Sequence, residues 1–460
     1  MCGEASLTRV MSLTPTPPGN DFLTKEELGR NEKTYPLDLY FCIDCKHFQL
    51  GHVVDPKILY QKNYSYVSAT SQHFVRHLKN YATKMIDFFG LQPGDLVVDI
   101  GSNDGTCLRF FEEKGMHVLG IDPAKSIADE ATKNGIETVA DFFSYDLALV
   151  LREKYGAVKY ITSHNACAHI DDLFDVMKGV EYWLAEDGIF VLEVGYLVDV
   201  YNNIWFDTIY HEHLDYHTVA PFDRLFDRVE MEVISVERIS PQGGSIRVMV
   251  QKKGGPLKRD NSVDKLIKLE HKLGLDRAET LSKLDTKINK AREELQILIQ
   301  SLKADGKKIA GFGAPTKSTT LMAHFGLDET VLDFIVDDNP LKQGLFTPIT
   351  HIPVLSSDVL YEMKPDYVLI LAWNFSEPIM KMHTKYSNEI GQFILPISKS
   401  IPKVIRLANE DDYAACLRLL NEHSKYHTSV SPDYLHLNNE TGFTLLVLED
   451  EIIVAISTFT

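Results

Sequence analysis

Short apolar runs alternate with helical segments through the middle of the chain. The runs at 96–100, 117–121, 158–163 and 188–194 are rich in β-branched residues and predict buried strands. The intervals between them have the length and periodicity of amphipathic helices. Such alternation is typical of a mostly parallel sheet covered by helices. The pattern therefore predicts an α/β domain over residues 71–256.

A second unit of the same kind follows. Residues 263–273 and 276–304 carry apolar side chains at three- and four-residue spacing, with Gly274 between the two segments. They predict two helices packed on their own protein; a dimerising coiled coil is the alternative. A strand followed by a glycine loop at 307–318, with further segments at 334–340 and 367–374, then predicts a second α/β unit. The helical connector and this unit together span 257–402.

The two ends of the chain have different patterns. Turn residues and aromatic side chains dominate residues 1–70, which predicts a small, loop-rich lobe. Residues 403–460 predict a strand, a helix around 411–422, a polar loop, and strands at 443–448 and 451–459.

A glycine loop follows the first predicted strand of the central domain. Gly101 and Gly105 allow a ligand to approach the backbone closely, and Asp122, at the end of the next strand, can accept both hydroxyls of a ribose. A dinucleotide loop would read G-x-G-x-x-G, whereas this loop has three residues between its glycines, including Asn103 and Asp104. A carboxylate there repels phosphate but tolerates a sulfonium. The loop therefore favours S-adenosylmethionine over NAD; a turn that binds nothing is the remaining alternative.

Four adjacent titratable side chains, Tyr210, His211, Glu212 and His213, follow the strand at 188–194 by about the length of a loop. His213 can act as a general base near neutral pH, with Glu212 and Tyr210 orienting a substrate or stabilising developing charge. A metal site is less well supported, because the second histidine of a helical H-E-x-x-H motif is missing. A solvated loop is the alternative.

Further polar groups are candidates for the same or a second site. His169 follows a predicted strand, and Tyr64 lies in an aromatic segment near the lobe. The turn that contains Gly244, Ser245 and Arg247 can present backbone amides and a guanidinium to a ligand, although a simple hairpin has a similar sequence.

The second α/β unit has its own glycine loop. Gly311, Gly313 and Lys317 resemble a phosphate cradle in which the lysine acts as a point charge. The spacing is not that of a Mg-ATP loop, so a site for a diphosphate is the better interpretation, with a structural turn as the alternative.

Charge and composition exclude several partners. The 460 residues include 47 Lys and Arg against 65 Asp and Glu, a formal net charge of −18, which argues against nucleic acid and anionic membranes as partners. The sequence shows neither an apolar run of membrane-spanning length nor a secretory leader, so a cytoplasmic protein is expected.

The six cysteines are too scattered for a disulfide framework. Cys42 and Cys45 form half of a structural zinc site, and Cys2 is a candidate third ligand. His47 and His52 are spare donors, and a lobe without metal is equally compatible with this pattern.

Together these segments resemble the sugar C-methyltransferase family, whose members methylate C3 of a nucleotide-linked 4-keto-deoxysugar. The matching segments are Tyr35-Pro36-Leu37, Cys42-x-x-Cys45, Tyr64-x-Tyr66-x-Ser68, residues 99–105 (DIGSNDG), Tyr210-His211-Glu212-His213, residues 243–247 (GGSIR) and residues 311–314 (GFGA). The resemblance extends from Cys2 to about Pro402. It implies an N-terminal zinc-binding lobe, a class I methyltransferase domain and a C-terminal Rossmann-like domain, with the nucleotide sugar held by the last two.

The resemblance also implies residue roles. His213 is expected as the base, with Tyr210, Glu212, His169 and Tyr64 as its companions. The expected ligands of S-adenosylmethionine are Asp99, Gly101, Asn103, Gly105, Asp122 and Asn165; those of the substrate are Gly244, Ser245, Arg247, Gly313 and Lys317; those of zinc are Cys2, Cys42 and Cys45. The partner of Cys2 in the family pattern would fall before Met1, which predicts an incomplete zinc ligand set.

The segment 403–460 resembles the opening strand, helix and hairpin of a GNAT-type N-acetyltransferase. It lacks the glycine-rich acyl-CoA loop, so no acetyl transfer is expected. For the chain as a whole, the alternatives are an O- or N-methyltransferase acting on another small molecule, a non-catalytic subunit that binds S-adenosylmethionine or a nucleotide sugar, and, third, a dehydrogenase. A monomer or weak homodimer is expected.

Overall fold

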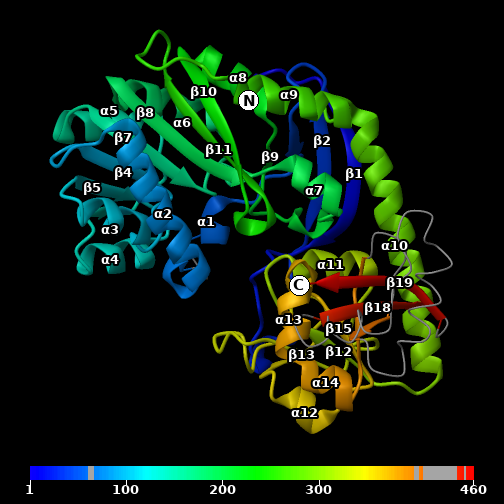
Figure 1. Ribbon diagram of the computed structural model, residues 1–460. Helices are drawn as coiled ribbons and strands as arrows, with labels where there is room; N and C mark the ends of the chain where they lie inside the picture. Colours follow the sequence, from blue (N-terminus) through cyan, green and yellow to red (C-terminus); the bar gives the residue numbers. More distant parts are fainter. Residues whose placement is uncertain (61–66, 398–403, 408–442, 450–451, 460) are drawn as a thin grey trace. The chain divides into compact units, whose positions relative to one another are not determined.

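The computed structural model describes residues 1–60, 67–397, 404–407, 443–449 and 452–459 (Figure 1). The chain divides into two compact units. The first comprises Met1–Leu13 and Tyr35–Asp285, and the second comprises Thr14–Thr34 and Thr286–Thr460. Among the helices of the described ranges, none combines the length and the apolar composition needed to cross a membrane.

A seven-stranded sheet forms the centre of the first unit (Figure 1). Its strands, in spatial order, are β10 (Met231–Ile239), β11 (Ser245–Lys252), β8 (Leu184–Gly195), β7 (Val158–His164), β4 (Leu96–Ile100), β5 (His117–Ile121) and β6 (Thr138–Val139). Strand β11 is antiparallel to both of its neighbours, and the other six strands are parallel. This confirms the four strands expected in the central domain and the mostly parallel sheet.

Helices lie before, between and after these strands in the chain. They are α2 (Gln72–Phe89), α3 (Thr106–Glu112), α4 (Lys125–Lys133), α5 (Tyr145–Tyr155), α6 (Leu173–Trp183), α7 (Leu197–Asn203), α8 (Val219–Arg228) and α9 (Asn261–Leu273). Helix α2 begins where the Ser71 side chain accepts a hydrogen bond from the backbone N–H of Phe74, and it ends at Gly90 with φ 63°. Phe74, Leu78 and Met85 lie on its buried face, in one core cluster with residues of β4 and β8.

A small four-stranded sheet forms the N-terminal lobe. Its strand order is β1 (Leu7–Thr16), β2 (Tyr35–Cys42), β3 (Phe48–Leu50) and β9 (Asp215–Tyr216). The short helix α1 (Pro56–Tyr60) follows β3 in the chain. The last of these strands comes from the segment after α7, far along the chain. The lobe predicted over residues 1–70 therefore includes a strand that the pattern of those residues could not reveal.

The second unit has its own sheet, of order β14 (Val354–Leu355), β13 (Ile335–Val336), β12 (Ile309–Phe312), β15 (Tyr367–Ile370), β16 (Gln392–Ile394), β17 (Val404–Leu407), β18 (Phe443–Glu449) and β19 (Ile452–Phe459). The first five strands are parallel, and the last three join them in antiparallel pairs. The unit's helices are α11 (Ser318–Phe325), α12 (Val359–Met363), α13 (Ser376–Met382) and α14 (Thr384–Glu389).

Helix α10 (Ala278–Ala304) follows α9 after a break at Gly274, as expected from the sequence. Its apolar stripe is buried at Leu281, Leu284, Ile288 and Leu295. In the C-terminal segment, the three expected strands are present, while the helix expected around 411–422 lies outside the described residues.

Candidate active site

The glycine loop between β4 and α3 has a backbone that requires its small residues. Gly101 and Gly105 have φ values of 78° and 76°. A Cβ atom at Gly101 would lie 2.5 Å from the Cβ of Ala166, and one at Gly105 would lie 2.9 Å from the Ile136 side chain. Asn103 has φ 51°, in the left-handed region that asparagine tolerates best among residues with side chains. The loop therefore makes a tight turn at the C-terminal end of β4, where ligands bind in sheets of this kind.

Asp122 lies at the corresponding end of β5. Its Oδ2 accepts the backbone N–H of Asn103 at 2.9 Å, and its Oδ1 accepts that of Ala124 at 2.9 Å. Burial raises the pKa of this carboxyl, while the two backbone hydrogen bonds lower it. Since a carboxylate offers about four acceptor positions, two remain for the ribose hydroxyls expected here.

The other expected cofactor residues lie at the same edge. Asp99 is buried near the end of β4, and burial raises its pKa to about 7. Asn165, directly after β7, has φ 58° and donates its backbone N–H to the carbonyl of Glu193 at 2.7 Å. The structure thus brings the six predicted residues to adjacent ends of three parallel strands. Their contacts with S-adenosylmethionine remain predictions.

A segment from the start of the domain lies over this loop. The backbone N–H of Ser68 donates to Asn103 Oδ1 at 2.9 Å, and that of Ala69 donates to Asp104 Oδ2 at 3.0 Å. The polar side chains of the loop therefore hold the segment that precedes α2, a role that the sequence analysis missed. Tyr64 lies outside the described residues, so its expected place in the site remains a prediction.

His213 lies in a defined hydrogen-bonding geometry. Its Nδ1 is 2.9 Å from the carbonyl oxygen of Thr208, and its Nε2 is 3.0 Å from the hydroxyl oxygen of Tyr210. Because a carbonyl only accepts hydrogen bonds, Nδ1 bears a proton. In the neutral form of the ring, the lone pair of Nε2 would then face the tyrosine hydroxyl. This is the tautomer that a general base acting through Nε2 needs.

His169 is a second imidazole beside His213. The two ring centroids are 5.0 Å apart, with the rings edge to face. The Tyr60 hydroxyl lies 2.9 Å from His169 Nδ1. Burial lowers the pKa of His169 well below its usual value, and His213 and His217 lower it further, so this ring is neutral near pH 7. Tyr60 is a neighbour that the sequence analysis did not single out.

The structure distinguishes the two histidines of the Tyr210–His213 segment. The side chain of His211 is fully buried, and its Nε2 lies 3.2 Å from the backbone carbonyl of Tyr35. His213 is only partly buried, whereas Glu212 between them is buried. A base must reach its substrate, so the geometry supports His213 in that role and gives His211 a structural one.

Arg247 lies within an internal ion-pair network. Its Nε donates to Glu193 Oε1 at 2.7 Å, and its Nη1 donates to Glu237 Oε2 at 2.9 Å. Burial opposes ionisation of Glu193, but hydrogen bonds from His164 and His77 and the charge of Arg247 lower its pKa below its usual value. The guanidinium thus has two carboxylate partners within the protein, and its expected role toward a substrate remains a prediction.

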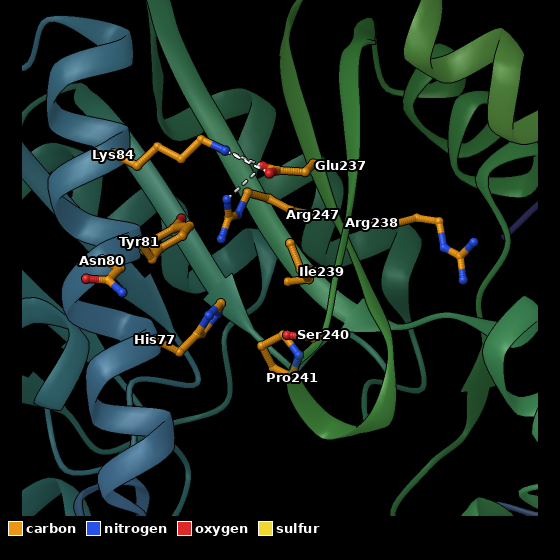
Figure 2. A pocket seen from close by; sticks show the side chains of 10 residues that line it. All are labelled: His77, Asn80, Tyr81, Lys84, Glu237, Arg238, Ile239, Ser240, Pro241 and Arg247. Atoms are coloured by element: carbon orange, nitrogen blue, oxygen red, sulfur yellow. Dashed lines mark hydrogen bonds and ion pairs between the residues drawn. The ribbon is translucent and has the colours of Figure 1, made fainter. Parts of the chain in front are cut away.

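A pocket of about 370 Å³ lies beside this network (Figure 2). Helix α2 contributes one wall, and β10 and the turn after it contribute another. In Figure 2, Lys84 and Arg247 both point toward Glu237, whereas Arg238 points away from them. The lining residues are His77, Asn80, Tyr81, Lys84, Glu237, Arg238, Ile239, Ser240, Pro241 and Arg247. The charged groups at its centre are therefore paired with one another.

The remaining predicted residues of this turn have structural contacts. Gly244 has φ 134°, and a Cβ atom there would lie 2.5 Å from Asp199 Cγ. Ser245 is buried and donates its hydroxyl to the carbonyl of Pro241 at 3.0 Å. The segment forms the tight hairpin between β10 and β11 that the sequence analysis gave as the alternative. The expected contacts of Gly244 and Ser245 with a substrate remain predictions.

The second unit repeats the arrangement of a strand, a glycine and a helix. Gly313, directly after β12, has φ 87°, and the backbone N–H of Ala314 donates to Asp337 Oδ2 at 2.6 Å. Lys317 Nζ donates to Asn374 Oδ1 at 2.5 Å. The structure thus places Gly313 and Lys317 on one loop at the carboxyl end of the parallel strands.

Cys2, Cys42 and Cys45 form a cluster whose Sγ atoms all lie within 4.8 Å of one another. Thiolates are preferred zinc ligands, and three of them fit a tetrahedral site with one further ligand. The two histidines considered as spare donors have other contacts: His47 pairs with Asp215, and the ring of His52 stacks on Tyr35. The three cysteines therefore suit zinc, with a fourth ligand still to be assigned.

Three family models match successive parts of this chain. They are described as "Putative zinc binding domain" over residues 1–60, "Methyltransferase domain" over residues 73–236 and "C-methyltransferase C-terminal domain" over residues 240–398. Together with the glycine loop and the sheet order, these matches define the class of protein: an S-adenosylmethionine-dependent methyltransferase with an N-terminal zinc-binding type of lobe.

A curated relative identifies the family. The chain is 33% identical to the C-methyltransferase NovU of Streptomyces niveus over 405 residues, which cover 88% of this chain and 96% of the relative. The chain therefore belongs to the C-methyltransferase family that includes NovU.

Solved structures of methyltransferases also match. An S-adenosylmethionine-dependent methyltransferase from Clostridium acetobutylicum has 12% identity and a TM-score of 0.33, and the match covers 39% of this chain and 92% of that one. Magnesium protoporphyrin IX methyltransferase from Synechocystis, with bound SAH, has 15% identity and a TM-score of 0.31, over 39% of this chain and 83% of that one.

Proposed function

We propose that this C-methyltransferase transfers the methyl group of S-adenosylmethionine to C3 of a nucleotide-diphosphate 4-keto-deoxysugar. The observation that supports it best is the geometry of His213, whose Nδ1 faces a carbonyl and whose Nε2 faces a tyrosine hydroxyl. Carbon methylation needs a carbanion equivalent, and a ketone makes the proton on the neighbouring carbon acidic enough for an imidazole to remove.

The roles of the side chains follow from this geometry. Nε2 of His213 takes the C3 proton, and the electron pair of the C–H bond moves into the enolate. The hydroxyl of Tyr210, 3.0 Å from Nε2, is placed to donate a hydrogen bond to the enolate oxygen. His169, held neutral by burial, can donate a second one. Bound S-adenosylmethionine would supply the methyl group: the bond from C3 to the methyl carbon would form as the bond from sulfur to that carbon breaks, the C4 ketone would be restored, and S-adenosylhomocysteine would leave. The proton taken from C3 would remain on His213.

The glycine loop of the second unit is the proposed binding element for the diphosphate. Its Gly313 leaves the backbone accessible, and Lys317 supplies a positive charge on the same loop.

The first experiment combines methyl-labelled S-adenosylmethionine with a set of nucleotide-linked 4-keto-6-deoxysugars. We expect NMR and mass spectrometry to detect a new methyl group bound to C3. With S-adenosylhomocysteine in place of the methyl donor, we expect exchange of the C3 proton with deuterated solvent. A methyl ether or amine as the product, without carbon exchange, would contradict the proposal and favour an O- or N-methyltransferase.

His213→Ala tests the base. We expect turnover and C3 proton exchange to fall by at least about 100-fold, the usual contribution of a general base, with binding of S-adenosylhomocysteine by calorimetry unchanged. His271→Ala is the control, because His271 is an exposed histidine on α9 outside the proposed site. An active His213→Ala enzyme would exclude His213 as the base.

A further inference from the structure

The segment that contains His213 continues directly into the sheet of the N-terminal lobe. Strand β9 begins two residues after His213, and it pairs with β3, with Tyr216 opposite Phe48 and Asp215 opposite Gln49. The backbone N–H of Leu50 donates to the carbonyl of Leu214 at 2.8 Å. The backbone next to the proposed base is therefore held by a strand of the lobe.

The backbone of this segment also forms a hydrogen bond to the residue that precedes His169, the second imidazole of the site. The N–H of Leu214 donates to the carbonyl of Ala168 at 2.7 Å, directly before His169 in the chain. A displacement of β9 would therefore act on both His213 and His169.

A buried side-chain pair strengthens this junction. Nε2 of His47 lies 2.6 Å from Oδ1 of Asp215, and the side chains of the two residues are 0% and 11% exposed. Hydrogen bonds to a charged group in such surroundings are short and strong, and losing one partner leaves the other buried without compensation. This pair is a side-chain contact between β9 and the residues before β3.

The position of His47 is set by the cysteine turn. His47 lies two residues after Cys45, and its carbonyl accepts the backbone N–H of Cys42 at 2.8 Å. Lys46, between the second cysteine and His47, has φ 66°, a left-handed conformation that the turn imposes on a residue with a side chain. The cysteine cluster and Asp215 are thus linked through a single residue.

We propose that His47 and Asp215 are positioning residues of the methyl-transfer site. The cysteine turn of the lobe fixes His47, His47 holds Asp215, and Asp215 fixes the backbone that presents His213. This inference rests on the proposed role of His213 as the base. It assigns the lobe a part in the reaction: a shift of about 1 Å in a catalytic group can cost on the order of 100-fold in rate.

The test compares truncation with conservative replacement of the same side chain. Asp215→Ala removes the acceptor, and we expect kcat to fall by about tenfold to 100-fold, with the KM for S-adenosylmethionine and the affinity for S-adenosylhomocysteine little changed. Asp215→Asn retains an oxygen acceptor for His47, and we expect it to restore most of kcat.

His47→Leu removes the other partner of the same hydrogen bond. This variant replaces Asp215→Ala in the test if Asp215→Ala does not fold. Asp276→Asn is the matched control, because Asp276 pairs with His271 at 2.9 Å on α9, away from β9.

A second readout does not depend on the reaction. In protein labelled with ¹⁵N in histidine, we expect the ring signals of His213 to shift in Asp215→Ala and in His47→Leu, and to stay near the wild-type values in Asp215→Asn and Asp276→Asn. Unchanged His213 signals and an unchanged kcat in Asp215→Ala would overturn the inference, as would an Asp215→Asn enzyme as impaired as Asp215→Ala. An active His213→Ala enzyme would instead refute the proposed base, while the ¹⁵N signals would still report whether the lobe positions this segment.

Discussion

At the scale of single residues, the environment of a side chain decides which of two similar groups can do chemistry. His211 and His213 are two positions apart, yet one ring is fully buried against the backbone of the lobe and the other is partly exposed beside Tyr210. The sequence indicated a cluster of titratable groups and favoured His213 by resemblance. The separation of their roles depends on the contact of His211 with Tyr35, 176 positions away in the sequence, and on that of His213 with Thr208, five positions away.

Asp99 gives a residue-scale prediction about pH. Burial raises its pKa from the ordinary 3.8 to about 7. Between these values the folded protein keeps a proton that the unfolded chain has released, so the free energy of unfolding falls as the pH rises, by at most about 1.4 kcal/mol per pH unit from this group. We expect Asp99→Asn to reduce this fall between pH 5 and pH 7, as measured by urea unfolding at each pH.

A matched substitution on the surface provides the control for this pH dependence of the free energy of unfolding. Asp129 lies exposed on α4 and pairs with Lys125. Asp129→Asn should leave the pH dependence of unfolding as it is in the wild type. If Asp99→Asn and the wild type lose stability equally over the same pH range, the buried carboxyl does not titrate there.

At the scale of elements, the register of two strands explains a buried carboxylate with several partners, that of Glu193. Strand β11 runs antiparallel to β8 with Arg247 opposite Glu193, which brings the two side chains together on the face covered by α2. His77 of α2 adds a hydrogen bond to the same carboxylate at 2.7 Å. Three elements thus converge on Glu193, although the sequence suggested Arg247 as a substrate ligand.

Arg247→Leu tests whether Arg247 mainly stabilises the fold or mainly binds the substrate. Removing one partner of a buried ion pair leaves an uncompensated charge, so we expect the free energy of unfolding to fall by about 3–5 kcal/mol. Arg238→Leu breaks the partly exposed pair with Asp199 and should cost about 0–1 kcal/mol. Urea unfolding measures both. A stable Arg247→Leu protein with a raised KM for the sugar substrate would instead support the predicted role in binding.

At the scale of the whole molecule, a strand from within the methyltransferase domain completes the sheet of the N-terminal lobe. Strand β9 is the fourth member of that sheet, so the lobe cannot form all its backbone hydrogen bonds without the rest of the first unit. The cysteine cluster lies in the same lobe. Metal binding and the order of the segment that contains His213 are therefore expected to be linked.

Loss of a metal ligand tests this linkage. Cys42→Ser removes one of three clustered thiols, and since metal binding stabilises only a folded site, we expect less bound zinc by elemental analysis and a lower unfolding temperature. Cys167→Ser is the control, because this buried cysteine lies outside the cluster. Equal zinc content in both variants would show that Cys42 is not a ligand.

The sequence by itself determined the α/β class, the strands at 96–100 and 117–121 and the glycine loop, and it predicted which polar residues bind the cofactor. These features depend on the local spacing of apolar residues and on the backbone conformations open to glycine, and both can be read from a short segment of sequence. Gly101 illustrates this: its φ of 78° suits glycine wherever the loop is placed.

Only the tertiary structure decided which polar groups meet. Asp215 pairs with His47 across 168 positions of sequence, His169 meets Tyr60 across 109, and Arg247 meets Glu193 across 54. Such contacts depend on strand register and on packing between distant segments, which no local pattern encodes. The physical reason is that a side chain's chemistry is set by its neighbours in space, and those neighbours are fixed only when the chain folds.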